Sequence, residues 1–239
     1  MELYLIPLVF ALVAAISPKN MVKYIGLAGA VATLIATVVK AMAFQTGSTV
    51  LVYDPELVTS FGLTFKMGYD GMGLFMVLLT NVIVPIILLS NLNRKVANER
   101  GFNAMVLLMQ VALIGVFTAL DGILFYVFWE LTLVPIFLIA LWYGATDSKK
   151  SLVKFFIYTL VGSLFILIVM LGIALAYMDP YETAISLQKL GVNQGFGIEA
   201  LQSMQTALAA HEIAPNQIVH SFDMQALSDA NNCQPNNLF

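Results

Sequence analysis

Six apolar runs, most of them close to 20 residues long, dominate the first 178 positions of the chain. They cover Leu3–Ile16, Val22–Phe44, Tyr69–Leu92, Phe102–Leu120, Gly122–Tyr143 and Leu152–Met178. A helix of about 20 residues spans the hydrocarbon core of a bilayer, at roughly 1.5 Å per residue. The pattern therefore predicts an all-α fold. Residues 1–178 are expected to form a polytopic membrane bundle of about six transmembrane helices, and residues 179–239 a polar, partly helical extramembrane tail.

The amino-acid composition argues against a soluble globular fold and limits the kinds of partner that the chain could bind. Hydrophobic residues make up 60% of the 239 positions and charged residues 10%, against roughly a quarter charged in soluble domains. The lipid bilayer is thus the expected surrounding, and a net charge of −3 gives no electrostatic footprint for nucleic acid. Cys233 is the single cysteine, too few for a disulfide, or for the roughly four thiolates of an iron–sulfur cluster. Any redox cofactor is expected on other chains.

The first run, Met1 to Ser17, has the length of a signal peptide but lacks its basic start. It carries Glu2 and neither lysine nor arginine, whereas a signal peptide needs a positively charged n-region. We therefore interpret this run as a retained first helix.

Lysine and arginine distribution predicts the orientation of the helices. The first, third and fifth connections carry Lys19, Lys23, Arg94, Lys95, Arg100, Lys149, Lys150 and Lys154. The second, fourth and post-sixth segments carry only Lys66 and Lys189. Because cytoplasmic loops carry the excess of basic residues, the odd connections are expected in the cytoplasm and both chain ends outside. Lys40 is expected to reach the outer headgroups by snorkelling.

The connection between the second and third helices, 45–66, contains two β-prone stretches. Residues 48–53 read Ser-Thr-Val-Leu-Val-Tyr, Asp54-Pro55-Glu56 follows as a turn, and Gly62–Phe65 is the second stretch. This arrangement favours a small surface hairpin.

Glu130 is the most informative residue, because it lies near the middle of the fifth apolar run. A carboxylate at this depth costs a few kcal/mol or more and is functional by default. It suits a proton relay, which needs a group able to hold and release H⁺. The alternative is a purely structural polar contact between packed helices. Tyr126 and Val134 share its helical face, and neither is a cation, so a balancing charge must come from elsewhere.

The sequence gives weaker support for a functional role of Pro135 and Lys154. Pro135 removes a backbone donor and frees the Leu131 carbonyl, which favours either a water-admitting opening beside Glu130 or ordinary kinked packing. Lys154 opens the sixth run, about 14 Å from Glu130 along the membrane normal, with Ser163 further in. It is either a second relay group, through intermediate waters or side chains, or an interfacial anchor.

The remaining candidates favour structural roles. Asp70 and Asp121 precede the third and fifth helices, where acids complement the helix dipole. Gly26 and Ala30 form a small-xxx-small pair, which favours close packing of the second helix. The two histidines, His211 and His220, and the lone cysteine give no metal spacing.

Three segments resemble the antiporter-like proton-pumping subunits of respiratory complex I, most closely subunit M, the counterpart of mitochondrial subunit 4. The first is Phe-Trp-Glu-Leu-Thr-Leu-Val-Pro-Ile-Phe (128–137) with Leu-Trp-Tyr-Gly after it. The others are Lys154-Phe-Phe-Ile-Tyr-Thr and Asp70-Gly-Met-Gly-Leu-Phe. The resemblance covers residues 1–178 and implies that Glu130 is the family's helix 5 glutamate. In the family that glutamate works with a lysine on helix 7, and Lys154 falls on the lysine of the helix 6 motif.

The resemblance also implies partners and cofactors. The partners are other membrane-arm subunits of an NADH–quinone oxidoreductase in a bacterial inner membrane. This chain would carry no redox site, and FMN, iron–sulfur clusters and quinone would belong to those partner subunits. Proton transport through a buried Glu/Lys relay would be coupled to electron transfer there. The alternatives are a subunit of a multisubunit cation/proton antiporter or membrane-bound hydrogenase, and a non-transporting scaffold.

The sequence departs from the family after the sixth helix. The family has about fourteen helices with inverted repeats, and neither the helix 7 lysine nor the Pro-Leu-His-x-Trp-Leu-Pro-Asp segment after it occurs here. We therefore expect an N-terminal fragment or a frameshifted product, with the frame changing near residue 231. Reading the DNA beyond codon 239 in all three frames tests this expectation.

Overall fold

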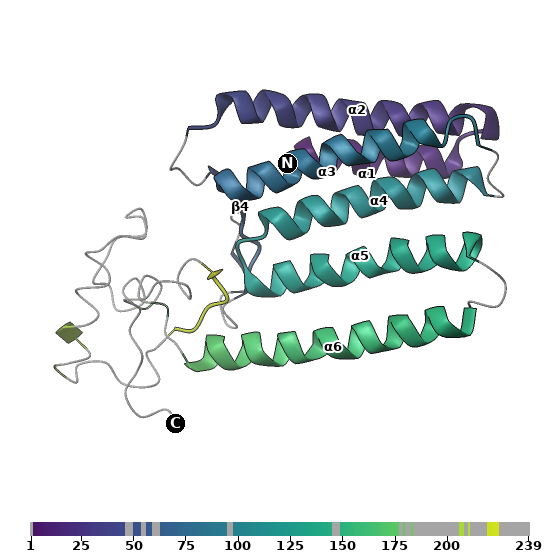
Figure 1. The fold of residues 1–239 in the computed structure, drawn as a ribbon. Helices are drawn as coiled ribbons and strands as arrows, with labels where there is room; N and C mark the ends of the chain where they lie inside the picture. The colour runs from purple at the N-terminus through teal and green to yellow at the C-terminus, as the bar shows by residue number, and fades with distance from the viewer. Residues whose placement is uncertain are drawn as a thin grey trace. The chain divides into compact units, whose positions relative to one another are not determined.

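A computed structural model describes most of the apolar part of the chain. The described residues are 2–45, 50–53, 56–58, 63–94, 98–144, 149–176, 179, 183, 206–207, 210 and 219–224. Six helices lie in this part: α1 (Glu2–Ile16), α2 (Lys19–Ala43), α3 (Gly71–Ser90), α4 (Glu99–Thr118), α5 (Gly122–Tyr143) and α6 (Lys149–Ala176) (Figure 1). Five of them, α2 to α6, are long and apolar enough to cross a membrane, and α1 is a shorter apolar helix. The predicted helical membrane fold is confirmed.

Contacts divide the chain into two compact units. The first, the helical unit, comprises Met1–Tyr53, Met67–Ala119 and Leu124–Ser163. The second comprises Asp54–Lys66, Leu120–Ile123 and Leu164–Phe239. Most of the predicted tail, 179–239, lies outside the described residues, although the Ala210 N–H donates a backbone hydrogen bond to the Thr206 carbonyl at 3.0 Å.

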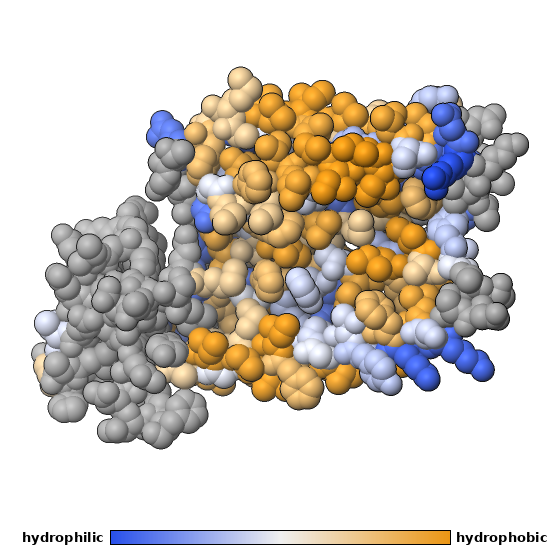
Figure 2. Space-filling model, viewed as in Figure 1, coloured by the Kyte–Doolittle hydropathy of each residue, from blue (hydrophilic) through white to orange (hydrophobic). Residues whose placement is uncertain are grey.

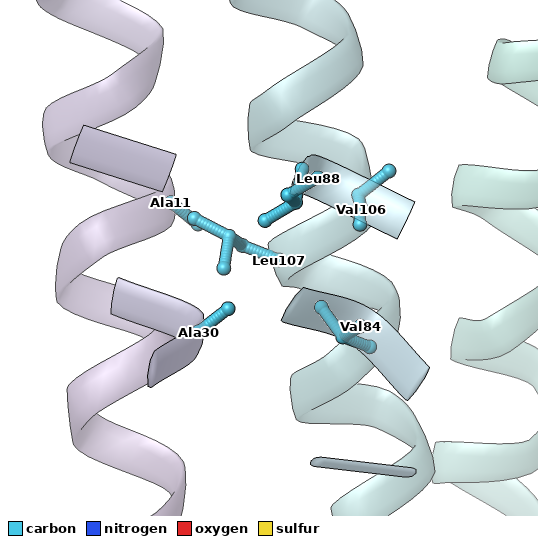
Figure 3. Close-up of a cluster of buried hydrophobic side chains, with 6 residues drawn as sticks. All are labelled: Ala11, Ala30, Val84, Leu88, Val106 and Leu107. Carbon is cyan, nitrogen blue, oxygen red and sulfur yellow. The ribbon is translucent and has the colours of Figure 1, made fainter. Parts of the chain in front are cut away.

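Helices α1 to α4 of the helical unit pack on one another around a core of small and branched side chains. Its buried members come from all four helices: Ala11, Ala30, Val84, Leu88, Val106 and Leu107 (Figure 3). Small residues allow the helices to approach closely, as the sequence predicted for Gly26 and Ala30. A Cβ at Gly26 would lie 2.6 Å from Oδ1 of Asn103 on α4, and Ala30 is fully buried.

A chain of polar side chains also crosses this bundle. Thr37 of α2 donates its hydroxyl hydrogen to the Thr33 carbonyl at 2.8 Å. Its oxygen accepts from Nδ2 of Asn81 on α3 at 2.7 Å, and Asn81 Oδ1 accepts from Nε2 of Gln110 on α4 at 2.7 Å. All four side chains are fully buried. Because water is scarce at this depth, each of these bonds holds two polar groups that would otherwise be costly to bury.

The predicted hairpin exists as two antiparallel strand pairs with a different register. In the helical unit, β1 (Val50–Tyr53) pairs with β4 (Met67–Tyr69). In the second unit, β2 (Glu56–Val58) pairs with β3 (Leu63–Thr64). The predicted partner of the first strand, Gly62–Phe65, was therefore wrong, since Glu56 continues into a strand of its own. The turn at Asp54 and Pro55 lies outside the described residues.

Charged and polar residues gather at the ends of the helices, as Figure 2 shows for one face. Lys23 forms an ion pair with Glu99 at 3.1 Å and donates to the Leu92 carbonyl. Lys40 forms an ion pair with Glu2 at 3.4 Å, so its ammonium group has a protein partner where the sequence suggested only lipid headgroups. These contacts join the ends of neighbouring helices.

Candidate functional site: the α5–α6 pair

Hydrogen bonds within the second unit hold the start of α5, some from residues nearby in the sequence and some from residues far along the chain. Asp121 Oδ1 accepts a hydrogen bond from the Ile123 backbone at 2.9 Å, which satisfies one of the free N–H groups of the first turn. Asp70 does the same for α3, accepting from Gly73 N at 2.7 Å. The predicted capping role is confirmed for both aspartates.

Residues 219–224 add a further contact at the same helix start, which sequence reasoning missed. The Gly122 N–H donates to the Phe222 carbonyl at 2.8 Å, and the Met224 N–H donates to the Leu120 carbonyl at 2.9 Å. Asp223 also forms an ion pair with Lys66 at 2.5 Å. These partners are more than 90 residues apart along the chain, and no local pattern in the sequence signals them.

Packing against α4 determines which side of α5 faces the bundle. A Cβ at Gly115 of α4 would lie 2.2 Å from Cδ1 of Phe128, so the ring occupies space that only glycine leaves free. At the other end of α5, the Tyr143 hydroxyl donates to the Asn98 carbonyl just before α4. Tyr143 also packs edge-on against Phe102, with ring centroids 5.6 Å apart.

Glu130 lies near the middle of the 22-residue α5. Its Oε1 atom is buried and has no hydrogen-bond partner among the described residues. An ionised carboxylate without a partner is costly inside a protein or a bilayer. Within the part of the chain that the structure describes, the buried Oε1 of Glu130 is therefore open to a hydrogen-bond donor or a cation.

Tyr126 precedes Glu130 by one helical turn on the same face of α5. It lies within range of electrostatic interaction with Glu130 and with Ser163 of α6. Ser163 is 4% exposed, and Phe137 and Phe156 pack between the same two helices with ring centroids 4.7 Å apart. The sequence predicts that Tyr126 lies on the same helical face as Glu130, but it does not show that Ser163 of α6 lies near Tyr126.

Lys154 and Pro135 stand apart from this group. Lys154 is exposed on α6, and its side chain takes part in no ion pair within the described parts of the chain. The structure therefore does not bring it to Glu130. Pro135 is inside α5 without ending it, because the helix continues to Tyr143. The missing N–H of Pro135 leaves the Leu131 carbonyl without its usual helical donor.

Many of the remaining side chains of α5 and α6 are apolar and exposed. Around Glu130, the side chains of Val127, Trp129 and Val134 are each at least 40% exposed. In the described ranges, no three His, Cys, Asp or Glu side chains come together as candidate metal ligands. The polar groups at this pair, within the described residues, include a carboxyl group, a phenol and an aliphatic hydroxyl.

Fold and site together define a class: a polytopic membrane protein with a glutamate in the middle of a spanning helix, one of whose carboxyl oxygens is buried. Comparison with known families makes this more specific. A family profile described as NADH:quinone oxidoreductase/Mrp antiporter, transmembrane, matches residues 119–210, which include α5 and α6. This match, together with the relatives below, supports an antiporter-like subunit of the M/chain 4 type.

Individual relatives agree with that assignment. The chain is 36% identical over 175 residues to the F(420)H(2) dehydrogenase subunit M of Methanosarcina mazei, covering 72% of this chain and 35% of that protein. It is 35% identical over 173 residues to the NADH-quinone oxidoreductase subunit M of Buchnera aphidicola, covering 66% and 34%. The chain thus spans about a third of the length of these relatives.

A solved structure shows the same fold. A chain of respiratory complex I from Thermus thermophilus superposes with a TM-score of 0.61 at 27% sequence identity. The match covers 72% of this chain and 35% of that chain. The similarity therefore includes most of the membrane helices described here.

Proposed function

We propose that the chain is part of a proton-translocating membrane-arm subunit of a respiratory oxidoreductase, with Glu130 as its intramembrane proton-carrying group. The observation that carries this proposal is the buried Oε1 of Glu130 in the middle of α5, which has no hydrogen-bond partner among the residues that the structure describes. In general, a carboxyl group within a membrane span can hold a proton and release it when a positive charge approaches. That behaviour is what stepwise proton movement across a membrane requires.

The oxidoreductase setting is supported by the family assignment. Subunits of such complexes are the relatives of this chain, and electron transfer from the donor to quinone would take place on partner subunits. FMN, iron–sulfur clusters and quinone would be bound there. One relative is named for F(420)H(2) and another for NADH, so either donor is compatible with the residues of this chain.

Lys154 is the second residue of the proposed site. Its exposed position on α6 supports a role in which its charge acts from a distance or through intervening groups. We propose the inner membrane of a bacterium as the location, with both ends of the described helical region facing outward, because lysine and arginine are concentrated in the odd connections.

A Glu130→Gln variant of the complete subunit in its assembled complex tests the proposal. Glutamine keeps the size and a hydrogen-bonding amide but cannot exchange a proton, so we expect proton translocation per electron to fall at least about 100-fold. Electron transfer uncoupled from the gradient should persist. Lys154→Met in the same background is expected to lower translocation less severely. Unchanged pumping in Glu130→Gln would contradict the relay, and loss of assembly alone would favour a scaffold.

A cation/proton antiporter subunit is the alternative function, favoured by the family profile, which includes Mrp antiporters. The two functions predict different genetic surroundings. Neighbouring genes for redox subunits support the oxidoreductase, and neighbouring genes for small antiporter subunits alone support the antiporter.

A further inference from the structure

A narrow apolar groove follows the seam between α3 and α4 in the helical unit. Its volume is about 120 Å³, and its walls include Met76, Leu79, Ile83 and Ile87 of α3 and Met109 and Leu113 of α4. The α3 wall extends over about three helical turns, or about 16 Å along the axis. Thr80 also lines the groove, but its hydroxyl hydrogen is donated to the Met76 carbonyl at 3.0 Å. The walls therefore present apolar surface to whatever lies between them.

Asn91 continues the groove-lining row of α3 toward the connection with α4. It follows Ile87 by one helical turn on the same face, and its backbone N–H donates to the Ile87 carbonyl at 3.2 Å. The Asn91 side chain is 5% exposed, and its Nδ2 group has no hydrogen-bond partner among the described residues. Because a buried amide without an acceptor is costly, this end of the groove favours an occupant that brings an oxygen atom.

A positive charge lies beside this amide. The Arg94 N–H donates to the Asn91 carbonyl at 3.2 Å, and the Arg94 side chain is exposed, with no ion pair in the described part of the chain. Lys23 also reaches this turn, but Glu99 balances its charge at 3.1 Å. An anionic oxygen at this end of the groove would meet both the Asn91 amide and the Arg94 guanidinium group, which suits phosphate geometry.

The depth of these groups corresponds to the headgroup boundary of a bilayer. Asn81 is in the middle of the 20-residue α3, and Asn91 lies about 15 Å further along the axis. This distance is half of the hydrocarbon core, which is roughly 30 Å thick. Asn91 and Arg94 are therefore placed where phosphate and ester groups lie, and the groove begins one turn deeper, among the acyl chains.

An acyl chain suits this groove better than a helix of another protein. A chain of methylene groups is one carbon wide and bends to follow a narrow hollow, whereas a helix is about 10 Å across. Lipid tails are as apolar as leucine, so the groove by itself gives no hydrophobic preference for any occupant. Selectivity has to come from contacts along the walls and from hydrogen bonds at Asn91 and Arg94. A phospholipid with an anionic headgroup provides both.

We propose that the α3–α4 groove binds an anionic phospholipid from the leaflet on the side of the α3–α4 connection. One acyl chain lies along the α3 wall from Ile87 toward Met76. The amide of Asn91 rotates about its side-chain torsion angles and donates to a phosphate or ester oxygen, and Arg94 pairs with the phosphate. The bound lipid fills the seam between α3 and α4 and stabilises their packing. The site does not involve Glu130, so it stands apart from the proposed proton-carrying function.

Photo-crosslinking in the assembled complex tests the groove. The complex containing the complete subunit is reconstituted in nanodiscs of phosphatidylcholine with a small fraction of phosphatidylglycerol that carries a diazirine on one acyl chain. Adducts are located by peptide mass spectrometry, and we expect them to concentrate on the groove walls. Ile83→Phe fills the groove and should lower this labelling by roughly tenfold, which corresponds to about 1.4 kcal/mol of binding free energy. Ile86→Phe is the matched control, because Ile86 is 59% exposed on the same helix and does not line the groove.

Two further variants test the headgroup contact. Asn91→Leu and Arg94→Gln should each lower labelling by about tenfold, the effect of losing one hydrogen bond to a charged group. Lys150→Gln removes an exposed charge at the start of α6 and should leave labelling unchanged. A diacylglycerol with the same diazirine chain has no phosphate. It should label the groove more weakly than phosphatidylglycerol, and Arg94→Gln should not change its labelling.

Three results would overturn the proposal. The first is equal labelling of the groove walls in the wild type and in Ile83→Phe. The second is phosphatidylglycerol labelling that both Asn91→Leu and Arg94→Gln leave unchanged, because the headgroup would then have no site. The third is a groove without lipid adducts whose walls crosslink to another subunit, which would identify a protein as the occupant. Should Ile83→Phe fail to assemble, Leu79→Phe on the same wall, where Leu79 is 46% exposed, is judged by the same criterion.

Discussion

Gln110 of α4 donates a hydrogen bond from Nε2 to Oδ1 of Asn81 on α3 at 2.7 Å, and neither side chain has any exposed surface. The direction of this bond follows from its neighbours. Thr37 uses its hydrogen on its own helix, so Asn81 must present its amide hydrogens to Thr37 and its oxygen to Gln110. Three helices are thereby joined by polar contacts in one fixed order.

Asn81→Leu should destabilise the helical unit by about 1 to 2 kcal/mol, since it breaks two interhelical hydrogen bonds and leaves the Gln110 amide without its acceptor. The midpoint of unfolding in sodium dodecyl sulfate measures this loss. Thr132→Val is the control, because the Thr132 hydroxyl donates only within α5, to the Trp129 carbonyl. Equal midpoints for the two variants would show that the network contributes nothing to stability.

Gly115→Ala should lower stability by about 1 to 3 kcal/mol, because the new methyl group would lie 2.2 Å from the Phe128 ring and force α5 away from α4. Gly162→Ala provides a matched comparison on α6, where no atom lies within 4 Å of the new Cβ. It should be neutral or stabilise by up to about 1 kcal/mol. Thermal unfolding of the complete purified subunit measures both. A neutral Gly115→Ala would contradict the close α4–α5 contact.

The predicted orientation can be tested with single cysteines at the two ends of α3 in a Cys233→Ser background. Met72 is near the start of this helix and Ser90 is its last residue. If the odd connections are cytoplasmic, a membrane-impermeant maleimide added to intact cells should label Met72→Cys and not Ser90→Cys. Inverted vesicles should give the opposite result. Labelling of Ser90→Cys in intact cells would reverse the orientation.

Hydropathy located the helices well, because a bilayer imposes a length and an apolar composition on each span. The bounds of α5 were predicted without error, since Asp121 and Gly144 mark both ends. The start of α4 was predicted three residues late, at Phe102. The helix begins at Glu99 because Asn98 accepts a hydrogen bond from Gly101 N, and polar capping residues lie outside an apolar run.

Glu130 was also found from the sequence, because a charged residue inside an apolar run needs no tertiary information to be noticed. Its environment could not be predicted in the same way. Whether Ser163 faces Tyr126 depends on the rotation of α6 about its axis, and that helix is apolar on every side. The pairing of Asn81 with Gln110 likewise depends on how α3 and α4 pack, which no local pattern encodes.

The two contacts of α5 with α4 have a mechanical consequence for Glu130. Phe128 fits against Gly115 and Tyr143 bonds to Asn98, and these two levels are about 22 Å apart along the helix. Because α5 is held at two points this far apart, it cannot slide along its axis or pivot freely against α4. Any change in the reach of the Glu130 carboxyl group must then come from its own torsion angles or from the approach of α6, with α5 acting as the stationary frame.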